Sequence, residues 1–180
     1  FKQLKLTTER YADVLRQLGF KLNLTHQIKP KSIKEPKSIG IAPFAAFTSK
    51  MYPIDKMKIV TNKLAENGYK IYLFGGGKTE IDELKSWENF NHNITSLAGT
   101  VSFEEELQAI AKLEAMISMD SANMHLASLV GVPVVSIWGV THPNAGFLGY
   151  GQSWEGIIQD ENCQWRPTSV YGNKLGPSDN

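Results

Sequence analysis

The sequence has a single cysteine, Cys163, in 180 residues. One thiol excludes an internal disulfide and leaves no cysteine pair for a zinc site. Such low cysteine usage is typical of proteins from a reducing compartment. We therefore expect neither a disulfide framework nor a metal centre.

The sequence also lacks an excess of charge, a long apolar run and an initiating methionine. Lys and Arg number 19 against 18 Asp and Glu, so the chain has no global field to attract nucleic acid or an acidic membrane surface. No run approaches the roughly 20 apolar residues of a membrane-spanning helix. The first residues, FKQLKLTTERYADVL, lack the apolar core of a signal peptide. We expect a part of a longer protein that binds any anion through local groups.

What is present suffices for one ordinary globular core, since 42% of the residues are hydrophobic and 21% are charged. Residues 7–20 have the pattern of an amphipathic helix, with Thr7 or Thr8 as its N-cap. Its apolar face, which needs a surface to lie on, consists of Tyr11, Val14, Leu15 and Leu18. The following HQIKPKSIKEPK is rich in Lys and Pro and is typical of an exposed connector.

From Ser38 onward, strand-like and helix-like patterns alternate. Strands are predicted at 38–43, 69–74, 93–99, 115–119, 132–138 and 155–159, and helices at 53–68, 79–87, 102–113 and after Asp120. Such alternation predicts right-handed crossover units, and hence an α/β fold with a parallel sheet and helices on both faces. We divide the chain into an interdomain helix and linker (1–37), a ligand-binding domain (38–160) and an irregular tail (161–180).

Ligands bind such sheets beyond the carboxyl ends of the strands, so the turns there are informative. After the first strand, FAAFTSKMYP offers Thr48, Ser49 and Lys50, which can grip a phosphate; a solvated loop is the alternative. After the second, FGGGKTEIDEL permits close backbone approach, and Glu80 can accept from ribose hydroxyls. Its contiguous glycines do not match G-x-G-x-x-G, and Glu80 has an alternative role in offsetting a helix dipole.

The turn after the fourth strand, MDSANMHLASLV, carries an acid, a hydroxyl and a histidine. Free N–H groups of the helix that begins there point at the ligand edge and suit a phosphate. The alternative is that Asp120 or Ser121 only caps the helix and that His125 is a partly buried, hydrogen-bonded histidine. Because Asp120 would repel a phosphate, its better role is to accept sugar hydroxyls, with Lys50 and His125 supplying compensating donors.

The next turn, GVTHPNAGFLGYG, is long enough to form one wall of a pocket. It carries Thr141 and His142. A loop histidine outside any cluster is more often incidental than functional, and both interpretations stay open for His142.

Together these motifs resemble the carboxy-terminal domain of glycosyltransferase family 9, the ADP-heptose:lipopolysaccharide heptosyltransferases. The most specific is LAGTVSFEEELQAIAKLEAMISMDSANMHLASLVGVPVVSIWGVTHP, and FAAFTSKMYP, YLFGGG and the helix TTERYADVLRQLG also match. The resemblance covers roughly residues 7 to 151. It implies a Rossmann-like domain that forms one half of a GT-B two-domain enzyme, in which the amino-terminal domain binds the acceptor.

The resemblance also implies roles for individual residues. Lys50 with Thr48 and Ser49 would contact the donor's phosphates, Glu80 the ribose and the backbone near Val101 the adenine. Asp120 would hold sugar hydroxyls, and the pyrophosphate would lie at Ser121, Ala122 and His125. Ala122 stands where the family usually has Gly, and His142 where an acid is common. Only Cys163 remains of the family's cysteine-rich tail, so no metal site is carried over, and the catalytic base is expected in the other domain.

The resemblance implies an inverting transfer of heptose from ADP-heptose to a lipopolysaccharide or other surface glycan. No cofactor besides the nucleotide sugar substrate is expected, and no nucleic acid partner. The parent protein would be cytoplasmic, with peripheral association at the inner face of the inner membrane. Two alternatives stay open: a sugar-nucleotide epimerase of the same architecture, and a non-catalytic nucleotide or glycan sensor.

Overall fold

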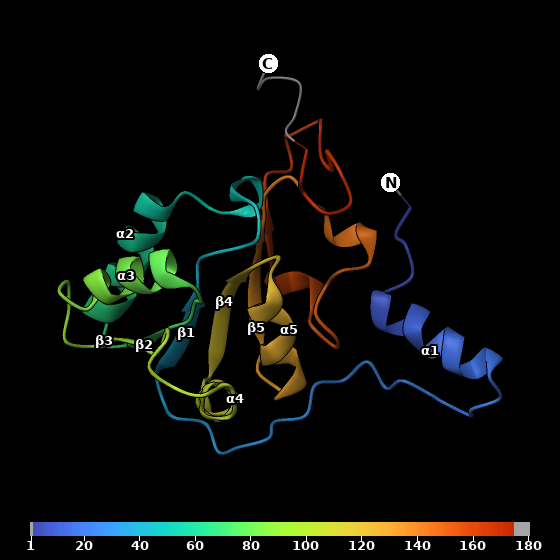
Figure 1. The fold of residues 1–180 in the computed structure, drawn as a ribbon, viewed down its shortest axis with the longest axis horizontal. Helices are drawn as coiled ribbons and strands as arrows, with labels where there is room; N and C mark the ends of the chain where they lie inside the picture. The colour runs from blue at the N-terminus through green and yellow to red at the C-terminus, as the bar shows by residue number, and fades with distance from the viewer. Residues whose placement is uncertain (1, 175–180) are drawn as a thin grey trace.

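A computed structural model describes residues 2–174 (Figure 1). The strands are β1 Ser38–Ala42, β2 Lys70–Leu73, β3 Ile94–Ser96, β4 Ala115–Met119, β5 Val134–Trp138 and β6 Ile157–Gln159. The α-helices are α1 Thr7–Gln17, α2 Ile54–Glu66, α3 Lys78–Trp87, α4 Phe103–Lys112 and α5 Ala122–Leu129. Short 3-10 helices occur at η1 Thr48–Lys50, η2 Pro143–Ala145 and η3 Trp154–Gly156. The predicted order of strands and helices is confirmed, with small displacements at their ends.

The six strands form one sheet in the order β3-β2-β1-β4-β5-β6, and all neighbours pair in parallel. In the centre, Ile39 of β1 is in register with Ile71 of β2 and with Ala115 of β4. The chain therefore leaves β1 toward one side of the sheet and leaves β4 toward the other. The carboxyl ends of β1 and β4 mark the switch point at which open α/β sheets bind ligands.

Two buried clusters lie on the two faces of the sheet. Residues of α2 and α3, such as Met57 and Trp87, pack with Ile41 and Leu73 on one face. Residues of α4 and α5, such as Ile110 and Met124, belong to the other cluster. Helices therefore cover both faces, as the apolar strand sequences predict.

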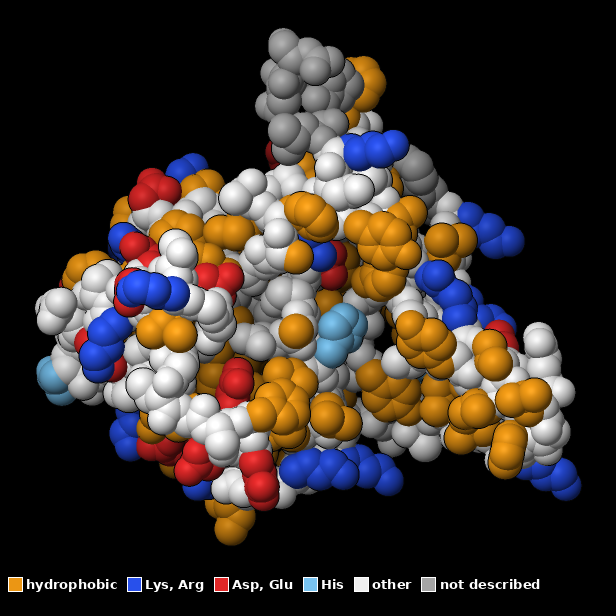
Figure 2. Space-filling view, viewed as in Figure 1, with side chains coloured by type: hydrophobic (Ala, Val, Ile, Leu, Met, Phe, Trp, Pro, Cys, Tyr) orange, Lys and Arg blue, Asp and Glu red, His pale blue; other side chains and the backbone are white. Residues whose placement is uncertain are grey.

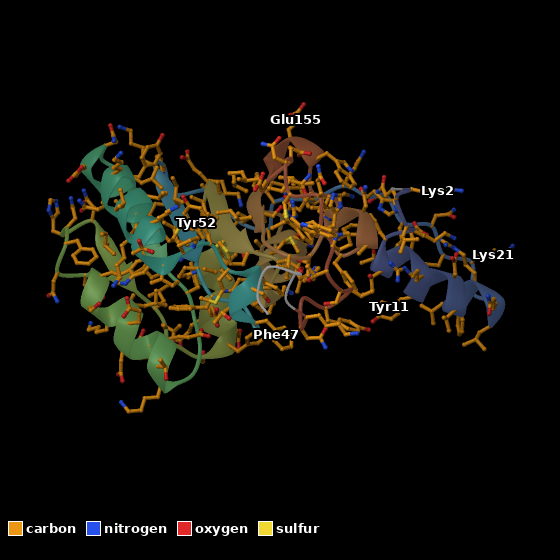
Figure 3. The ribbon with its side chains drawn as sticks, turned by 90° about the horizontal axis from the view of Figure 1, so that it is seen from above. Lys2, Tyr11, Lys21, Phe47, Tyr52 and Glu155 are labelled. Atoms are coloured by element: carbon orange, nitrogen blue, oxygen red, sulfur yellow. The ribbon has the colours of Figure 1, made fainter. Side chains whose placement is uncertain are left out.

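The helix α1 lies at one end of the molecule, apart from the sheet and its helices (Figures 1 and 3). It is attached to η2, where the Thr7 hydroxyl donates to the Gly146 carbonyl at 3.0 Å. The prediction that Thr7 or Thr8 caps this helix is wrong, because the N-cap is Leu6 and no side chain supplies a capping bond. Within α1 only Ala12 is buried.

The predicted apolar face of α1 is exposed to solvent. No other part of the described chain covers this face. Its exposed residues are Tyr11, Val14, Leu15 and Leu18. Across residues 2–174, no helix is long and apolar enough to cross a membrane.

The connector from α1 to the sheet contains no helix or strand between residues 20 and 35, yet it is tied to the body. The His26 N–H donates to the Tyr150 hydroxyl at 2.8 Å, and the Lys31 N–H donates to the Val130 carbonyl at 3.2 Å. The backbone of Lys29 passes directly over Gly131, where any Cβ would collide with its carbonyl. The connector therefore has a fixed path over the end of α5.

The described part of the tail, 161–174, contains no helix or strand and is packed onto the domain. Arg166 is buried and donates to the Thr141 carbonyl at 2.7 Å and to the Gln159 side chain at 3.1 Å. Farther on, the Ser49 hydroxyl donates to the Gly172 carbonyl at 2.6 Å. The remainder of the predicted tail, 175–180, lies outside the described residues.

Gly131 and Gly68 provide a matched test of the connector contact. Both follow helices with positive φ, of +75° and +81°, but only Gly131 has backbone above it. We expect Gly68→Ala to lower the free energy of unfolding by about 1 kcal/mol through left-handed strain alone. Gly131→Ala should cost clearly more, because the connector must also move. Urea denaturation measures both, and equal losses would mean that the connector contact contributes nothing to stability.

Candidate functional site

A cavity of about 490 Å³ opens at the carboxyl ends of β1, β2 and β4. Figure 2 shows this side of the molecule hollowed near its centre. The polar and glycine residues that line the cavity are Lys50, Gly75, Gly76, Glu80, Asp120, Ser121, Asn123 and His125. Its apolar walls include Phe44, Phe74, Ala122, Phe147 and Tyr171. The volume lies within the range of small-molecule sites.

The amino terminus of α5 faces this cavity without a side-chain cap. Ser121 is the N-cap residue, but its side chain makes no capping bond and instead shares a hydrogen bond with the Ser118 hydroxyl at 3.1 Å. The alternative that Asp120 or Ser121 only caps the helix is therefore wrong. The first-turn N–H groups at Ala122 and Asn123 stay available to an anion.

Asp120 is the centre of a buried polar cluster at the base of the cavity. Its Oδ2 accepts from the Lys50 ammonium at 2.8 Å and from the Thr141 hydroxyl at 2.8 Å. The side chains of Lys50 and Asp120 are only 13% and 8% exposed, and Thr141 is 1% exposed. Lys50 is therefore a fixed cation rather than a mobile loop lysine, and it neutralises the carboxylate that would otherwise repel a phosphate.

His125 lies one turn into α5, on the wall of the cavity. Partial loss of hydration in the hollow lowers the pKa of His125, the Asp120 carboxylate acts to raise it, and the Lys50 ammonium lowers it further. The ring is consequently neutral near pH 7. Its surface is exposed, and no hydrogen bond to its ring occurs within the part of the chain that the structure describes. The alternative of a partly buried, hydrogen-bonded histidine agrees with the partial loss of hydration but lacks the hydrogen bond within the described residues.

Glu80 holds the glycine loop in place. Its Oε2 accepts from the Gly76 N–H at 2.9 Å, so one carboxylate oxygen shapes the loop. A side chain at Gly75 would crowd Leu84 and Glu80, which explains the need for glycine there. Within residues 2–174 the second oxygen of Glu80 accepts no hydrogen bond, and Glu80 lines the cavity, so this oxygen can accept a ligand hydroxyl.

The structure does not bring every predicted residue to the cavity. Thr48 is exposed, Ser49 is bound to the tail, and neither lines the cavity. Val101 precedes α4 and is also absent from the lining. The roles predicted for these three residues stay predictions.

His142 lies away from the cavity, in a separate hollow beside the tail. Its Nδ1 accepts the Asn144 N–H at 3.0 Å and so closes the turn at η2. Burial, followed by the nearby Arg166 charge, lowers the pKa of His142. This position favours a local structural role.

Several residues in or beneath the lining have no clear signal in the sequence. Thr141 reaches Asp120 from 21 residues away, and only the shared sheet edge relates the two. Phe147 and Tyr171 approach each other with ring centroids 6.1 Å apart, although Tyr171 belongs to the tail without periodicity. The position of Thr141 in a turn after a strand was the one available hint.

The cavity suits an anion that also carries hydroxyl groups. Free N–H groups, a fixed ammonium and a histidine lie at one end, and a carboxylate beside a glycine loop lies at the other. Within residues 2–174, no three His, Cys, Asp or Glu side chains gather closely enough to hold a metal ion.

The Lys50–Asp120 pair can be tested with a double-mutant cycle. Lys50→Met leaves a buried carboxylate without its cation, so we expect a loss of roughly 3 kcal/mol in the free energy of unfolding. Adding Asp120→Asn should recover part of that loss, because no uncompensated charge remains. Denaturant unfolding of the two single variants and the double variant measures the coupling, and simple additivity would contradict the pair.

Comparisons with known proteins show the family of this chain. The family model for glycosyltransferase family 9 (heptosyltransferase) matches residues 2–175. Lipooligosaccharide heptosyltransferase 2 of Haemophilus influenzae is 31% identical over 110 residues, which cover 58% of this chain and 32% of that protein. Lipopolysaccharide heptosyltransferase 2 of Escherichia coli is 28% identical over 115 residues, covering 61% of this chain and 33% of that protein. The chain thus spans about a third of these relatives.

Solved structures share the fold at low sequence identity. The E. coli heptosyltransferase WaaC with ADP superposes with a TM-score of 0.69 at 19% identity, covering 88% of this chain and 51% of that one. A glycosyl transferase family 9 protein from Veillonella parvula gives a TM-score of 0.65 at 20% identity, covering 97% of this chain and 56% of that one. With a family model that matches nearly its whole length, the chain belongs to glycosyltransferase family 9, the heptosyltransferase family.

Proposed function

We propose that this chain is the donor-binding domain of an inverting glycosyltransferase that moves heptose from ADP-heptose to a lipopolysaccharide-type acceptor. The observation that carries the proposal is the uncapped amino terminus of α5, which faces a 490 Å³ cavity beside a fixed lysine. A diphosphate fits this combination because N–H groups and an ammonium both favour negative charge.

The positions of the polar groups around the cavity indicate how the donor would be oriented in it. Glu80 and the glycine loop lie at the end of β2, where a ribose and its base would be held, with Phe44 and Phe74 as apolar walls. The diphosphate would lie at α5 and Lys50. Asp120 has Oδ2 engaged by Lys50 and Thr141, which leaves Oδ1 to accept a hydroxyl of the transferred sugar.

The proposed reaction is a displacement at the anomeric carbon. The acceptor hydroxyl forms a bond to that carbon, the bond to the diphosphate oxygen breaks, and negative charge grows on the leaving group. Lys50, His125 and the N–H groups of α5 would stabilise that charge. Each helix-terminus contact contributes only about 0.3–1 kcal/mol, so several must act together. The base that takes the acceptor's proton is expected in the amino-terminal domain.

The choice of donor and acceptor rests on the relatives. The matched proteins are named lipopolysaccharide and lipooligosaccharide heptosyltransferases, and one matched structure contains ADP. Because this chain corresponds to about a third of those proteins, the complete transfer activity is assigned to the longer protein. The acceptor would reach the reaction through the amino-terminal domain, at the inner face of the inner membrane.

Nucleotide selectivity tests the donor assignment. We expect ADP to stabilise the chain by about 2.7 kcal/mol at a concentration 100-fold above its dissociation constant, and UDP or GDP at the same concentration to stabilise it less. Calorimetric titration and thermal unfolding measure this effect. Ala122→Glu should abolish it, because a carboxylate would occupy the anion position while remaining compatible with the start of a helix.

Ile59→Glu is the matched control, since it adds the same charge on α2, where Ile59 is 56% exposed and outside the cavity. ADP binding should survive this change. If Ala122→Glu bound ADP as well as the unmodified chain, the diphosphate position at α5 would be wrong.

The lowered pKa of His125 predicts how ADP affinity depends on pH. A bound diphosphate favours the charged ring and raises that pKa, so binding takes up a proton between the free and bound pKa values. Affinity should therefore rise as the pH falls through this window and level off below the free pKa. The phosphates of ADP also gain protons as the pH falls, and this contribution is the same for the unmodified chain and for His125→Gln. The difference between the two affinity profiles therefore isolates the contribution of His125. Parallel pH profiles would exclude His125 from the diphosphate site.

A further inference from the structure

The tail supplies two side chains to the donor cavity, which is the cavity at the carboxyl ends of β1, β2 and β4. They are Val170 and Tyr171, and they are 54% and 67% exposed although they line it. The ring of Tyr171 lies near the ring of Phe147, with centroids 6.1 Å apart and planes inclined by 45°. Figure 2 shows hydrophobic side chains beside the hollow. An exposed aromatic ring in the lining of a cavity offers apolar surface that a ligand can cover.

The loop that carries Tyr171 is held in place on both sides of this residue. On one side, the Thr168 N–H donates to the Val140 carbonyl at 3.1 Å. On the other side, the Gly172 carbonyl accepts from the Ser49 hydroxyl at 2.6 Å. The ring is therefore exposed but attached to a fixed backbone, which lowers the conformational entropy that a ligand must overcome on binding.

The residue that follows Tyr171 packs over the charged floor of the cavity. Gly172 has a positive φ of +74°, and a Cβ at this position would lie 2.7 Å from Lys50 Cγ and 3.0 Å from Thr141 Cγ2. Lys50 and Thr141 both donate to Asp120. Tyr171 is thus next in the chain to a residue in contact with this cluster, at the end of the cavity where Asp120 would accept a sugar hydroxyl.

The strand order gives the aromatic pair the same position. In the proposed orientation the ribose lies at the end of β2 and the diphosphate at the end of β4, and the sheet continues from β4 to β5 and β6. Phe147 follows β5 in the chain, and Tyr171 follows β6. A donor that extends from β2 past β4 therefore brings its sugar to the side of the sheet that supplies both rings.

We propose that Tyr171 is a specificity-determining residue of the donor site, whose ring packs against the C–H face of the transferred sugar. This inference rests on the proposed function, since it concerns the sugar of the same donor. Asp120 accepts a hydroxyl of that sugar, while Tyr171 covers its apolar face and Phe147 extends the apolar wall. The irregular tail thereby takes part in the choice of sugar, and the nucleotide is bound by other groups.

The test compares ADP-heptose with ADP in calorimetric titrations of the 180-residue chain. Tyr171→Ala removes the ring, so the ratio of the ADP-heptose affinity to the ADP affinity should fall about tenfold. Tyr171→Phe keeps the ring and should restore most of this ratio, because the contact depends on the face of the ring. An unchanged ratio in Tyr171→Ala would overturn the proposal.

Tyr11→Ala is the matched control. Tyr11 is 70% exposed, belongs to α1 and does not line the donor cavity. The ratio of the two affinities should therefore stay as in the unmodified chain. A similar fall in Tyr11→Ala and in Tyr171→Ala would overturn the proposal, because the effect would not come from a contact in the cavity.

Nuclear Overhauser effects locate the contact. Among the described residues, Tyr171 is the one tyrosine that lines the donor cavity. In a deuterated chain with protonated tyrosine rings, we expect effects from a tyrosine ring to the sugar protons of bound ADP-heptose, and their loss in Tyr171→Phe. Effects to the adenine protons instead would place the ring at the nucleotide and overturn the proposal.

Titration of the unmodified chain separates this proposal from the proposed function. Normal ADP binding without binding of ADP-heptose would overturn the sugar contact and leave the diphosphate position intact. Binding of neither ligand would contradict the proposed function, and this proposal with it.

Discussion

The buried carboxylate of Asp120 is the constraint on which the site depends. The end of β4 places this side chain where it is only 6% exposed, and an isolated charge there would be very costly. Lys50 from the β1 turn and Thr141 from the β5 turn both meet it. Three turns that are distant in sequence are thereby joined at one atom, and the cavity acquires a floor with fixed charges.

The tail takes part in the same cluster. Arg166 donates to the carbonyl of Thr141, and the residue at 172 must be small because Lys50 and Thr141 lie against it. The tail therefore holds the stem of Lys50 while Asp120 holds its ammonium. A segment with no regular secondary structure thus helps to position the charged groups of the site, through packing and hydrogen bonds.

Periodicity and turn chemistry predicted most of the fold. The strands at 115–119 and 134–138 are recognisable because buried parallel strands are apolar on both faces, and a capping box marks the start of α4. The cap of α1 was not predictable, because Thr7 donates to a residue 139 positions away. Local sequence contains no information about such a partner.

The sequence predicts which turns form the candidate site, but it does not predict which side chains pair within it. The sheet edge predicts that Lys50, Glu80, Asp120 and His125 gather, and the lining contains all four. The ion pair within this set does not follow from the sequence, since the resemblance implies phosphate contacts for Lys50 and sugar contacts for Asp120. Spacing reveals which strand ends meet, whereas pairing depends on side-chain conformations that only the packed structure fixes.

The bond from Ser49 to Gly172 spans 123 residues of sequence and has a consequence for folding. A contact of such high sequence separation is expected to form late, because closing a long flexible loop costs more entropy than a single contact offsets. The sheet and its helices rest on nearer neighbours and do not need this contact. We therefore expect the cavity at the carboxyl ends of β1, β2 and β4 to be completed late in folding. A chain that lacks this tail contact would have the fold without the finished cavity.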